Sequence, residues 1–245
     1  MNVFRTRLLC AYCSSALMLA SPILSAEWGE DAGWSGDAEF GAMLSTGNTD
    51  AQNITARSRL RYEIPLWRHT LQLEAYSGSE DGATTQERYL GTFQTDRKLT
   101  ERDYLFGVLR GEKDRFSGYD YQRALSAGYG RRVADTEHFR LDLEAGAGLR
   151  QARLEGGENE DETILRGAGA LDYRINDALR FTEDLLIQAG DNNTEVESIS
   201  ALRYRLNDKF TTRFALTVKH NTDVPEDREK TDTVTSISLV YDLWN

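Results

Sequence analysis

Stretches in which apolar and polar residues alternate recur along most of the chain. One such stretch runs from Phe139 to Arg150, where every second residue from Phe139 is apolar and the residues between are charged or glycine. Successive side chains of a β-strand point to opposite faces, so a period of two predicts a strand with one apolar and one polar face. The same alternation recurs over 209–219 and 236–243.

The alternation predicts about twelve strands, each roughly eleven residues long. Their approximate ranges are 34–45, 52–64, 69–78, 86–98, 104–113, 122–133, 138–150, 163–175, 179–189, 196–206, 209–220 and 233–244. Strands of globular proteins are usually about five to six residues long. A strand that crosses a bilayer at a tilt needs about nine to eleven. The strand lengths therefore favour a membrane-spanning barrel.

The connectors alternate in length. Those after even-numbered strands are short, at 65–68, 99–103, 134–137, 176–178 and 207–208. Most of those after odd-numbered strands are longer and acidic, at 79–85, 114–121, 155–162, 190–195 and 221–232, whereas 46–50 is a short exception. Outer-membrane barrels have short periplasmic turns and longer outer loops. The pattern predicts an antiparallel up-and-down transmembrane β-barrel, all-β, with both ends in the periplasm.

A soluble β-sandwich would also show alternation, with its apolar face turned inward. Strand length and connector parity weigh against it, as does the placement of Pro65 and Pro225 in connectors, where no ladder hydrogen bond is lost. Aromatic residues near strand ends suit the two membrane interfaces. They are Trp34, Tyr62, Trp67, Tyr104, Phe139, Tyr173, Phe181, Tyr204, Phe210, Tyr241 and Trp244.

The N-terminus has the features of a secretion signal. Arg5 and Arg7 precede an apolar stretch over 8–20, and small residues end at Ala26, after which we expect cleavage. This assigns residues 1–26 to a signal peptide and 27–245 to the barrel domain. Both cysteines lie in the signal at positions 10 and 13, so the mature chain has none. Disulfides, thiol catalysis and cysteine-ligated zinc are thereby excluded.

Composition narrows the possible classes further. The 245 residues are 40% hydrophobic with a mean hydropathy of −0.56. Outside the N-terminus no apolar run reaches the roughly eighteen residues of a transmembrane helix. Without Arg5 and Arg7, 27 basic residues face 40 acidic ones, which gives a net charge of −13. We expect no nucleic-acid partner, because phosphate contacts require basic surface.

Five short motifs, taken in order, resemble the YdiY-like family, whose members are labelled salt-induced outer-membrane proteins with a domain of unknown function. The motifs are Ser45 to Thr49, Asp114 to Tyr121, Gly128 to Arg131, Glu144 to Gly148 and Asp191 to Thr194. The resemblance extends from Trp34 to Trp244. It implies a β-barrel in the outer membrane of a Gram-negative bacterium and supplies no catalytic residue. One departure is Asn245, which follows Trp244 where such barrels usually end on an aromatic residue.

A barrel of this kind is expected to contact outer-membrane lipid and lipopolysaccharide. During biogenesis it is expected to meet periplasmic chaperones and the barrel assembly machinery. A monomer is favoured over an oligomer.

Charged residues on the polar faces are candidates for the lumen. Arg57, Arg59 and Arg61 share one face of a predicted strand, and Arg203 and Arg205 form a second short ladder. The other main candidates are Glu39, Glu74, Asp142, Glu144 and Arg213, joined by Asp37, Glu63, Arg150, Arg166, Asp172, Arg174, Asp184, Glu197 and Lys219. Two hypotheses remain open: a narrow channel whose arginines attract anions, or a salt-bridged barrel that braces the envelope without transport.

Other chemistry finds little support. The acidic outer loops could hold a divalent cation, but their spacing matches no calcium loop and favours solvated charge. These residues are Glu155, Glu158, Glu160, Asp161, Glu162, Asp223, Glu226, Asp227 and Glu229. Among the histidines only His220 lies near an outer loop, and no G-x-S-x-G motif is present. We therefore expect no enzyme, no metal and no cofactor, and a link to salt or osmotic stress as the family label implies.

Overall fold

The computed structural model describes residues 33–45, 51–80, 83–114, 119–154, 157, 159–224 and 229–243. The expected signal peptide, the connector 46–50 and the terminal pair Trp244 and Asn245 lie outside these ranges. The described residues form twelve strands. They are β1 (Gly33–Ser45), β2 (Ala51–Glu63), β3 (Trp67–Glu80), β4 (Ala83–Lys98), β5 (Asp103–Asp114), β6 (Tyr119–Asp135), β7 (Phe139–Leu154), β8 (Asn159–Arg174), β9 (Leu179–Gly190), β10 (Thr194–Arg205), β11 (Phe210–Asn221) and β12 (Thr231–Asp242).

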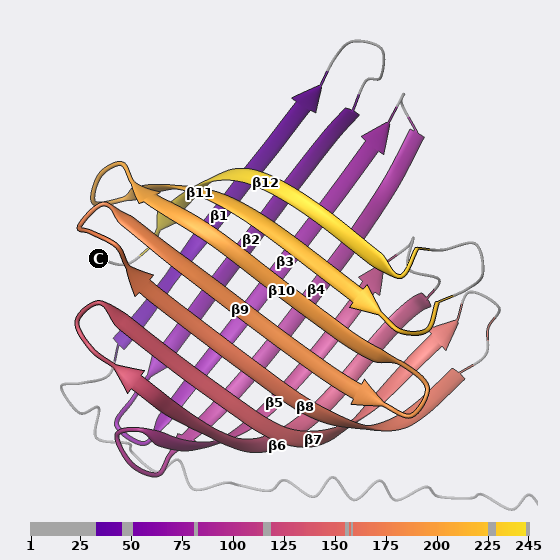
Figure 1. Cartoon of the computed structure of the whole chain (residues 1–245), viewed down its shortest axis with the longest axis horizontal. Helices are drawn as coiled ribbons and strands as arrows, with labels where there is room; N and C mark the ends of the chain where they lie inside the picture. The colour runs from indigo at the N-terminus through magenta and orange to yellow at the C-terminus, as the bar shows by residue number, and fades with distance from the viewer. Residues whose placement is uncertain are drawn as a thin grey trace, which may run out of the picture.

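Each strand pairs antiparallel with its neighbours in sequence, and β12 pairs with β1 to close the barrel. This confirms the predicted fold class. The strands run obliquely around the barrel, and the C-terminal end of the chain lies at the end that carries the short turns (Figure 1). In the part of the chain that the structure describes, no helix has the length and apolar content needed to cross a membrane.

The short turns are fixed by side chains that accept backbone hydrogen bonds. Asn176 Oδ1 accepts from the backbone N–H groups of Ala178 and Leu179, both at 2.9 Å. Asn207 Oδ1 accepts in the same way from Lys209 and Phe210, at 2.9 and 3.0 Å. Asparagine favours such turns because its side chain imitates a backbone turn. These tight connections lie at the end of the barrel that the connector pattern predicts to be periplasmic.

The strand limits differ from the predicted ones mainly at the outer end. Residues 159–162, predicted as part of an acidic loop, are the start of β8 and pair with 150–153 of β7. Arg150 Nε donates to Glu162 Oε1 at 2.8 Å, and the side chain of Gln151 donates to Asp161 at 2.9 Å. These charged and polar cross-strand pairs extend the hairpin beyond the apolar part of the strands, which the loop prediction missed.

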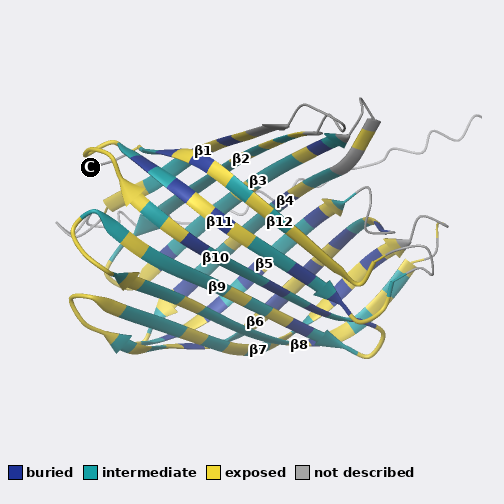
Figure 2. Ribbon diagram, turned by 45° about the horizontal axis from the view of Figure 1, so that its top comes forward, coloured by how far each residue is buried: buried dark blue, intermediate teal, exposed yellow. Residues whose placement is uncertain are grey.

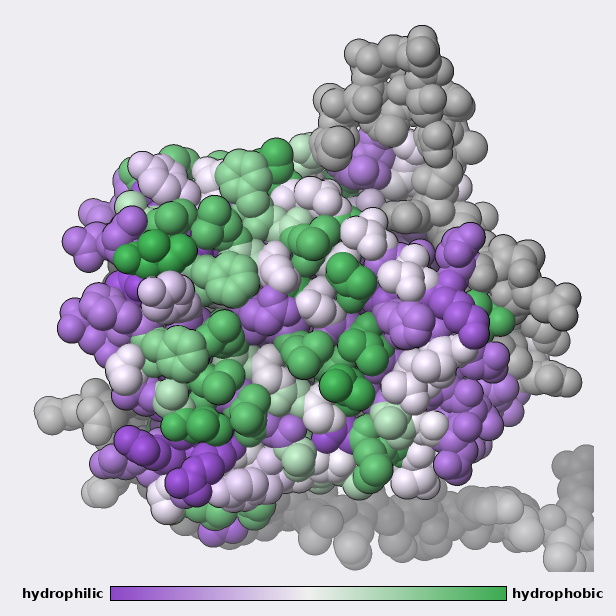
Figure 3. Space-filling model, viewed as in Figure 1, coloured by the Kyte–Doolittle hydropathy of each residue, from purple (hydrophilic) through white to green (hydrophobic). Residues whose placement is uncertain are grey.

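The outer surface carries an apolar band. Exposed large apolar side chains include Phe40, Leu109, Leu149, Leu165 and Ile237. On the face shown in Figure 3, such residues cover the middle of the barrel, and hydrophilic residues gather toward its two ends. Along the strands, exposed and less exposed residues alternate (Figure 2). This is the polarity expected of a barrel that faces lipid.

Several predicted interfacial aromatics lie on this outer surface near the short turns. Trp34 contacts Tyr62, with ring centroids 4.8 Å apart, and Phe139 contacts Tyr173 at 6.4 Å. Tyr104 is a correction, because only 6% of it is exposed and it packs inside the barrel with Phe106 and Val108. Since β5 carries apolar residues on both faces, its alternation could not assign Tyr104 to a side.

Glycines on β6 and β7 make room for these inner aromatics. A Cβ atom on Gly130 would lie 2.3 Å from the Tyr104 ring, and one on Gly146 would lie 2.9 Å from Phe106. At Gly128 a Cβ would also lie 2.2 Å from the backbone oxygen of Ala145. Residues without a side chain are therefore required where the inner wall approaches the aromatic rings.

Candidate functional site in the barrel lumen

The barrel encloses a cavity of about 860 Å³ to which every strand contributes. Its lining includes Asn176, Asp177 and Ala178 of the turn between β8 and β9, so the cavity reaches the end of the barrel that carries the short turns. The ten main lumen candidates from the sequence all lie in its lining: Glu39, Arg57, Arg59, Arg61, Glu74, Asp142, Glu144, Arg203, Arg205 and Arg213. The structure thus brings them together around one charged vestibule.

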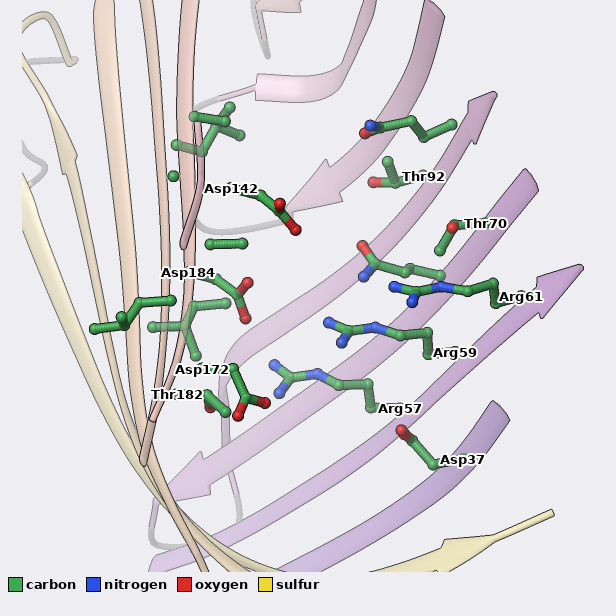
Figure 4. Close-up of a pocket in the computed structure, with 18 of the residues that line it drawn as sticks. Asp37, Arg57, Arg59, Arg61, Thr70, Thr92, Asp142, Asp172, Thr182 and Asp184 are labelled. Atoms are coloured by element: carbon green, nitrogen blue, oxygen red, sulfur yellow. The ribbon is translucent and has the colours of Figure 1, made fainter. Parts of the chain in front are cut away.

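Arginines and aspartates face each other across the vestibule. Figure 4 shows Arg57, Arg59 and Arg61 projecting from β2 toward Asp142, Asp172 and Asp184 on the far wall. With the Gln72 amide turned so that its oxygen faces Arg59, it accepts from Nε at 2.8 Å and from Nη2 at 2.9 Å. Facing charges of opposite sign therefore line the cavity at this level, and they create an electric field within it.

Glu39 joins strands on both sides of the barrel closure. Its carboxylate accepts from Arg213 Nη1 at 3.0 Å and from Ser238 Oγ at 2.5 Å, and it lies 3.8 Å from Arg57 Nη1. Arg57 is also paired with Glu74 at 3.1 Å. Because β1 pairs with β12 only from Asp37↔Asp242 to Gly41↔Ser238, these polar contacts reinforce a short seam.

A second network surrounds Glu144 on β7. Its two carboxylate oxygens accept from Gln94 at 2.8 Å, Tyr104 at 3.0 Å and Arg166 at 2.6 Å. Arg166 also lies over the Phe106 ring, 4.9 Å from its centroid. All the partners of this partly buried carboxylate come from strands β4 to β8, so the network joins neighbouring strands of one wall and leaves the lumen open.

A third cluster crosses the lumen in the outer half of the barrel. We call it the outer ion-pair layer; its members are Arg88 of β4, Arg110 and Glu112 of β5, Glu195 and Glu197 of β10, and Lys219 of β11. Arg110 Nη2 lies 2.7 Å from Glu197, 3.0 Å from Glu112 and 3.3 Å from Glu195. Arg88 links Glu112 at 2.8 Å with Glu197 at 3.0 Å, and Lys219 is bonded to Glu112.

The layer joins opposite walls of the barrel. In the closed strand order, β4 and β5 are separated from β10 and β11 by four strands on either side. Three positive and three negative side chains meet there, and Glu112, Glu195, Glu197 and Lys219 are each at most 5% exposed. Arg110 and Glu197 also line the vestibule, which gives the vestibule a charged end wall toward the outside.

Four members of this layer were not predicted from the sequence to face the lumen. Glu195 was placed in a loop, and Arg88, Arg110 and Glu112 were assigned to no lumen face. Arg110 and Glu112 continue the inner face of Tyr104, Phe106 and Val108, so apolar residues on that face concealed its polar end. Counting by two outward from the buried Tyr104 would have assigned both residues to the lumen.

The remaining candidates do not form a second site in the described residues. His220 Nδ1 shares a hydrogen bond with Thr231 Oγ1 at 2.8 Å, and its strand neighbour Asn221 bonds to Asn193 at 3.0 Å. Among the described residues, no group of three or more histidines and carboxylates has the geometry to hold a metal ion. Glu155, Glu158, Glu226 and Asp227 lie outside the described ranges.

Comparison with known proteins gives a family and a fold. A family described as "Protein of unknown function, DUF481" matches residues 38–243. The uncharacterized protein YdiY of Escherichia coli (strain K12) is 28% identical over 209 residues, which cover 85% of this chain and 82% of that protein.

Among solved structures, an outer membrane channel from Pseudomonas putida F1 has a TM-score of 0.50 at 11% identity, covering 86% of this chain and 94% of that chain. The NanC porin gives 0.49 at 12% identity, over 84% of this chain and 97% of that chain. At such low identity, the likeness to the Pseudomonas structure supports the barrel fold alone.

Proposed function

The chain belongs to the DUF481 family of proteins of unknown function, and we propose that it is a narrow outer-membrane channel for ions or small solutes. The observation that carries the proposal is the vestibule of about 860 Å³, open to the periplasmic turns and lined by charged side chains. An interior that served only as a core would be filled, as in barrels of about eight strands. This interior keeps a large polar space.

The outer ion-pair layer would set the conductance of such a channel. Buried charges are stable only while they remain paired and hydrogen-bonded, so the closed arrangement is the resting state. Passage requires ions or water to replace some of these contacts. A small conductance, much below that of a wide porin, is the expected consequence.

The same layer favours a second candidate function, a closed barrel that supports the envelope without transport. Its six charges join opposite walls and could serve only to brace them. The two functions differ in whether the layer opens on the time scale of ion flow.

Planar-bilayer recording of the refolded chain separates the two. A channel gives discrete conductance steps, and the variant with Arg110→Gln and Glu197→Gln gives larger steps, because both substitutions remove charge from the layer and Arg110→Gln also shortens the side chain. The matched control is Gln151→Glu with Asp161→Asn on the outer surface, which keeps the net charge and leaves the steps unchanged. Silence from the parent and from the layer variant contradicts the channel and supports the brace.

A role under salt or osmotic stress is a further part of the proposal and rests on the family resemblance. It predicts that a strain lacking the gene grows more slowly than its parent at raised osmolarity, and that the intact gene restores growth. Equal growth of the two strains contradicts this part and leaves the channel untouched.

A further inference from the structure

Four arginines lie in a row across adjacent strands near the periplasmic mouth. Arg174 of β8 is opposite Arg180 of β9, Arg180 is opposite Arg203 of β10, and Arg203 is opposite Arg213 of β11. All four line the vestibule. We call these residues the arginine row. Directly opposed residues of neighbouring strands have Cβ atoms roughly 4.5–5.5 Å apart, and like charges there destabilise the sheet.

The protein neutralises only half of this row. Arg180 is paired with Asp172 at 3.1 Å and Arg213 with Glu39 at 3.0 Å. Arg174 and Arg203 form no ion pair with any other residue of the described ranges. Two guanidinium groups that line the cavity are thus left without a carboxylate.

Asp184 is placed too far along the strands to neutralise Arg203, and Asp172, which lies near Arg174, is paired with Arg180. Asp184 also faces the vestibule, but its partner across the strands is Ile199, four residues from Arg203. Four residues of a strand span roughly 13 Å. Arg205, next on the lumen face after Arg203, donates to the backbone oxygen of Asp177 and holds the β8–β9 turn beside the row.

We propose that the arginine row is a binding site for small solutes with two or more negative charges, carried by phosphate or carboxylate groups. The planar guanidinium group donates two parallel hydrogen bonds to such oxyanions. Arg174 and Arg203 contact the solute, and the ion-paired Arg180 and Arg213 lie on either side of Arg203. The inference rests on the proposed channel in one respect: it names the class of solute that the vestibule admits from the periplasm.

The test is titration calorimetry of the refolded full chain in detergent at constant ionic strength. Pyrophosphate and citrate are titrated separately, so that phosphate and carboxylate chemistry are distinguished, and chloride supplies the baseline. Arg203→Gln and Arg174→Gln each remove one unpaired charge. The control is Arg97→Gln, which removes the same charge from an exposed position of β4 outside the cavity lining.

The parent is expected to bind at least one of the two anions more tightly than chloride. Each row variant weakens that binding about tenfold or more, the loss expected for a charge-assisted hydrogen bond, whereas Arg97→Gln changes nothing. Binding of one anion alone narrows the solute class. Heat-dependent gel mobility confirms folding, and if one row variant does not refold the other decides.

The inference is overturned if neither anion binds above chloride, or if both row variants bind like the parent. Calorimetry does not require conduction, so its outcome is independent of the channel. If the protein conducts but binds neither anion, the proposed anion site is wrong and the proposed channel stands. If the protein binds an anion but gives no conductance steps, the proposed channel is wrong and the proposed anion site stands.

Discussion

The two halves of the lumen use the same charged residue types in opposite arrangements. In the outer ion-pair layer, opposite charges from β4 and β5 meet those from β10 and β11 across the barrel. In the arginine row, like charges stand side by side on β8 to β11 along one wall. Strands β10 and β11 take part in both. The register of the strands, more than the amino-acid composition, therefore decides whether the charges at one level of the lumen pair with each other across the barrel or remain available to the proposed solute.

The two arrangements also differ in what solvent can do for them. Glu112 and Lys219 in the outer layer are 4% and 5% exposed, so each depends on the other charges of the layer. In the row, the side chain of Arg180 is 45% exposed and its charge is partly screened by water, whereas that of Arg213 is 6% exposed and depends on Glu39. Removing a charge from the outer ion-pair layer should therefore lower the unfolding free energy. Removing an unpaired charge from the arginine row should leave it level or raise it.

The largest expected effect follows from Glu112→Ala in the outer layer. It leaves Arg88, Arg110 and Lys219 short of a carboxylate in a buried place, and removing one partner of such a pair costs about 3–5 kcal/mol of unfolding free energy. Urea-induced unfolding in detergent micelles measures it. Asp161→Ala, at an exposed site that accepts one hydrogen bond from Gln151, is the control and should cost at most about 0.5 kcal/mol. Equal losses for both variants contradict the account of the layer.

A smaller loss is expected from Gly128→Ala in the wall that both halves share. The added Cβ would lie 2.2 Å from the backbone oxygen of Ala145 and 2.6 Å from Gly146 Cα, so the backbone itself must move. We expect a loss of about 1–3 kcal/mol, seen in the same unfolding assay. The comparison variant is Gly167→Ala, whose new Cβ meets nothing within 4 Å. An unaltered unfolding midpoint for Gly128→Ala would refute the close approach.

Glu39 is a buried carboxylate that binds a member of the arginine row, Arg213. Glu39→Gln keeps the shape but removes the charge that neutralises Arg213 and Arg57. Unfolding free energy should fall by about 1–3 kcal/mol, while pyrophosphate binding in calorimetry becomes a few-fold tighter because Arg213 adds its full charge to the row. If folded Glu39→Gln protein bound pyrophosphate more weakly than the parent, Arg213 would not be part of the anion site.

The smallest effect, and one of opposite sign, is expected from Arg203→Gln. It removes the central like-charge contacts with Arg180 and Arg213, so without multivalent anions the unfolding free energy should stay level or rise by about 0.2–1 kcal/mol. The urea assay in low-chloride buffer measures it, with Glu112→Ala beside it. If Arg203→Gln lowered the unfolding free energy as much as Glu112→Ala, the arginine row would stabilise the barrel in the same way as the outer ion-pair layer.

The alternation of residues was enough to predict the barrel and its strand number. Over 139–150 of β7 one face is apolar and the other is charged or glycine, so the prediction could assign sides directly. It could not do so in β5, where Leu105 and Leu109 face outward and Phe106 and Val108 inward. Arg110 and Glu112 on that inner face were missed for this reason.

Pairing across the lumen lay beyond sequence reasoning for a different reason. Arg110 and Glu197 are 87 residues apart and meet because the closed strand order places their strands on opposite walls. The arginine row depends on register between neighbours, which one residue of slip would undo. The individual residues Arg174, Arg203 and Arg213 were recognised as inward, but their alignment with Arg180 required the paired strands.

The central claim is that the vestibule communicates with the periplasm and is closed from outside by the ion-pair layer. The sequence has no cysteine after position 13, so Thr182→Cys in a chain expressed from residue 27 places a single thiol in the vestibule. A charged thiosulfonate reagent, added to one chamber of a planar bilayer at a time, measures access by its rate of reducing the current. We predict modification at least about tenfold faster from the periplasmic side, a difference that disappears when Arg110→Gln and Glu197→Gln are added. Equal rates from both sides of the otherwise unaltered channel would contradict the claim.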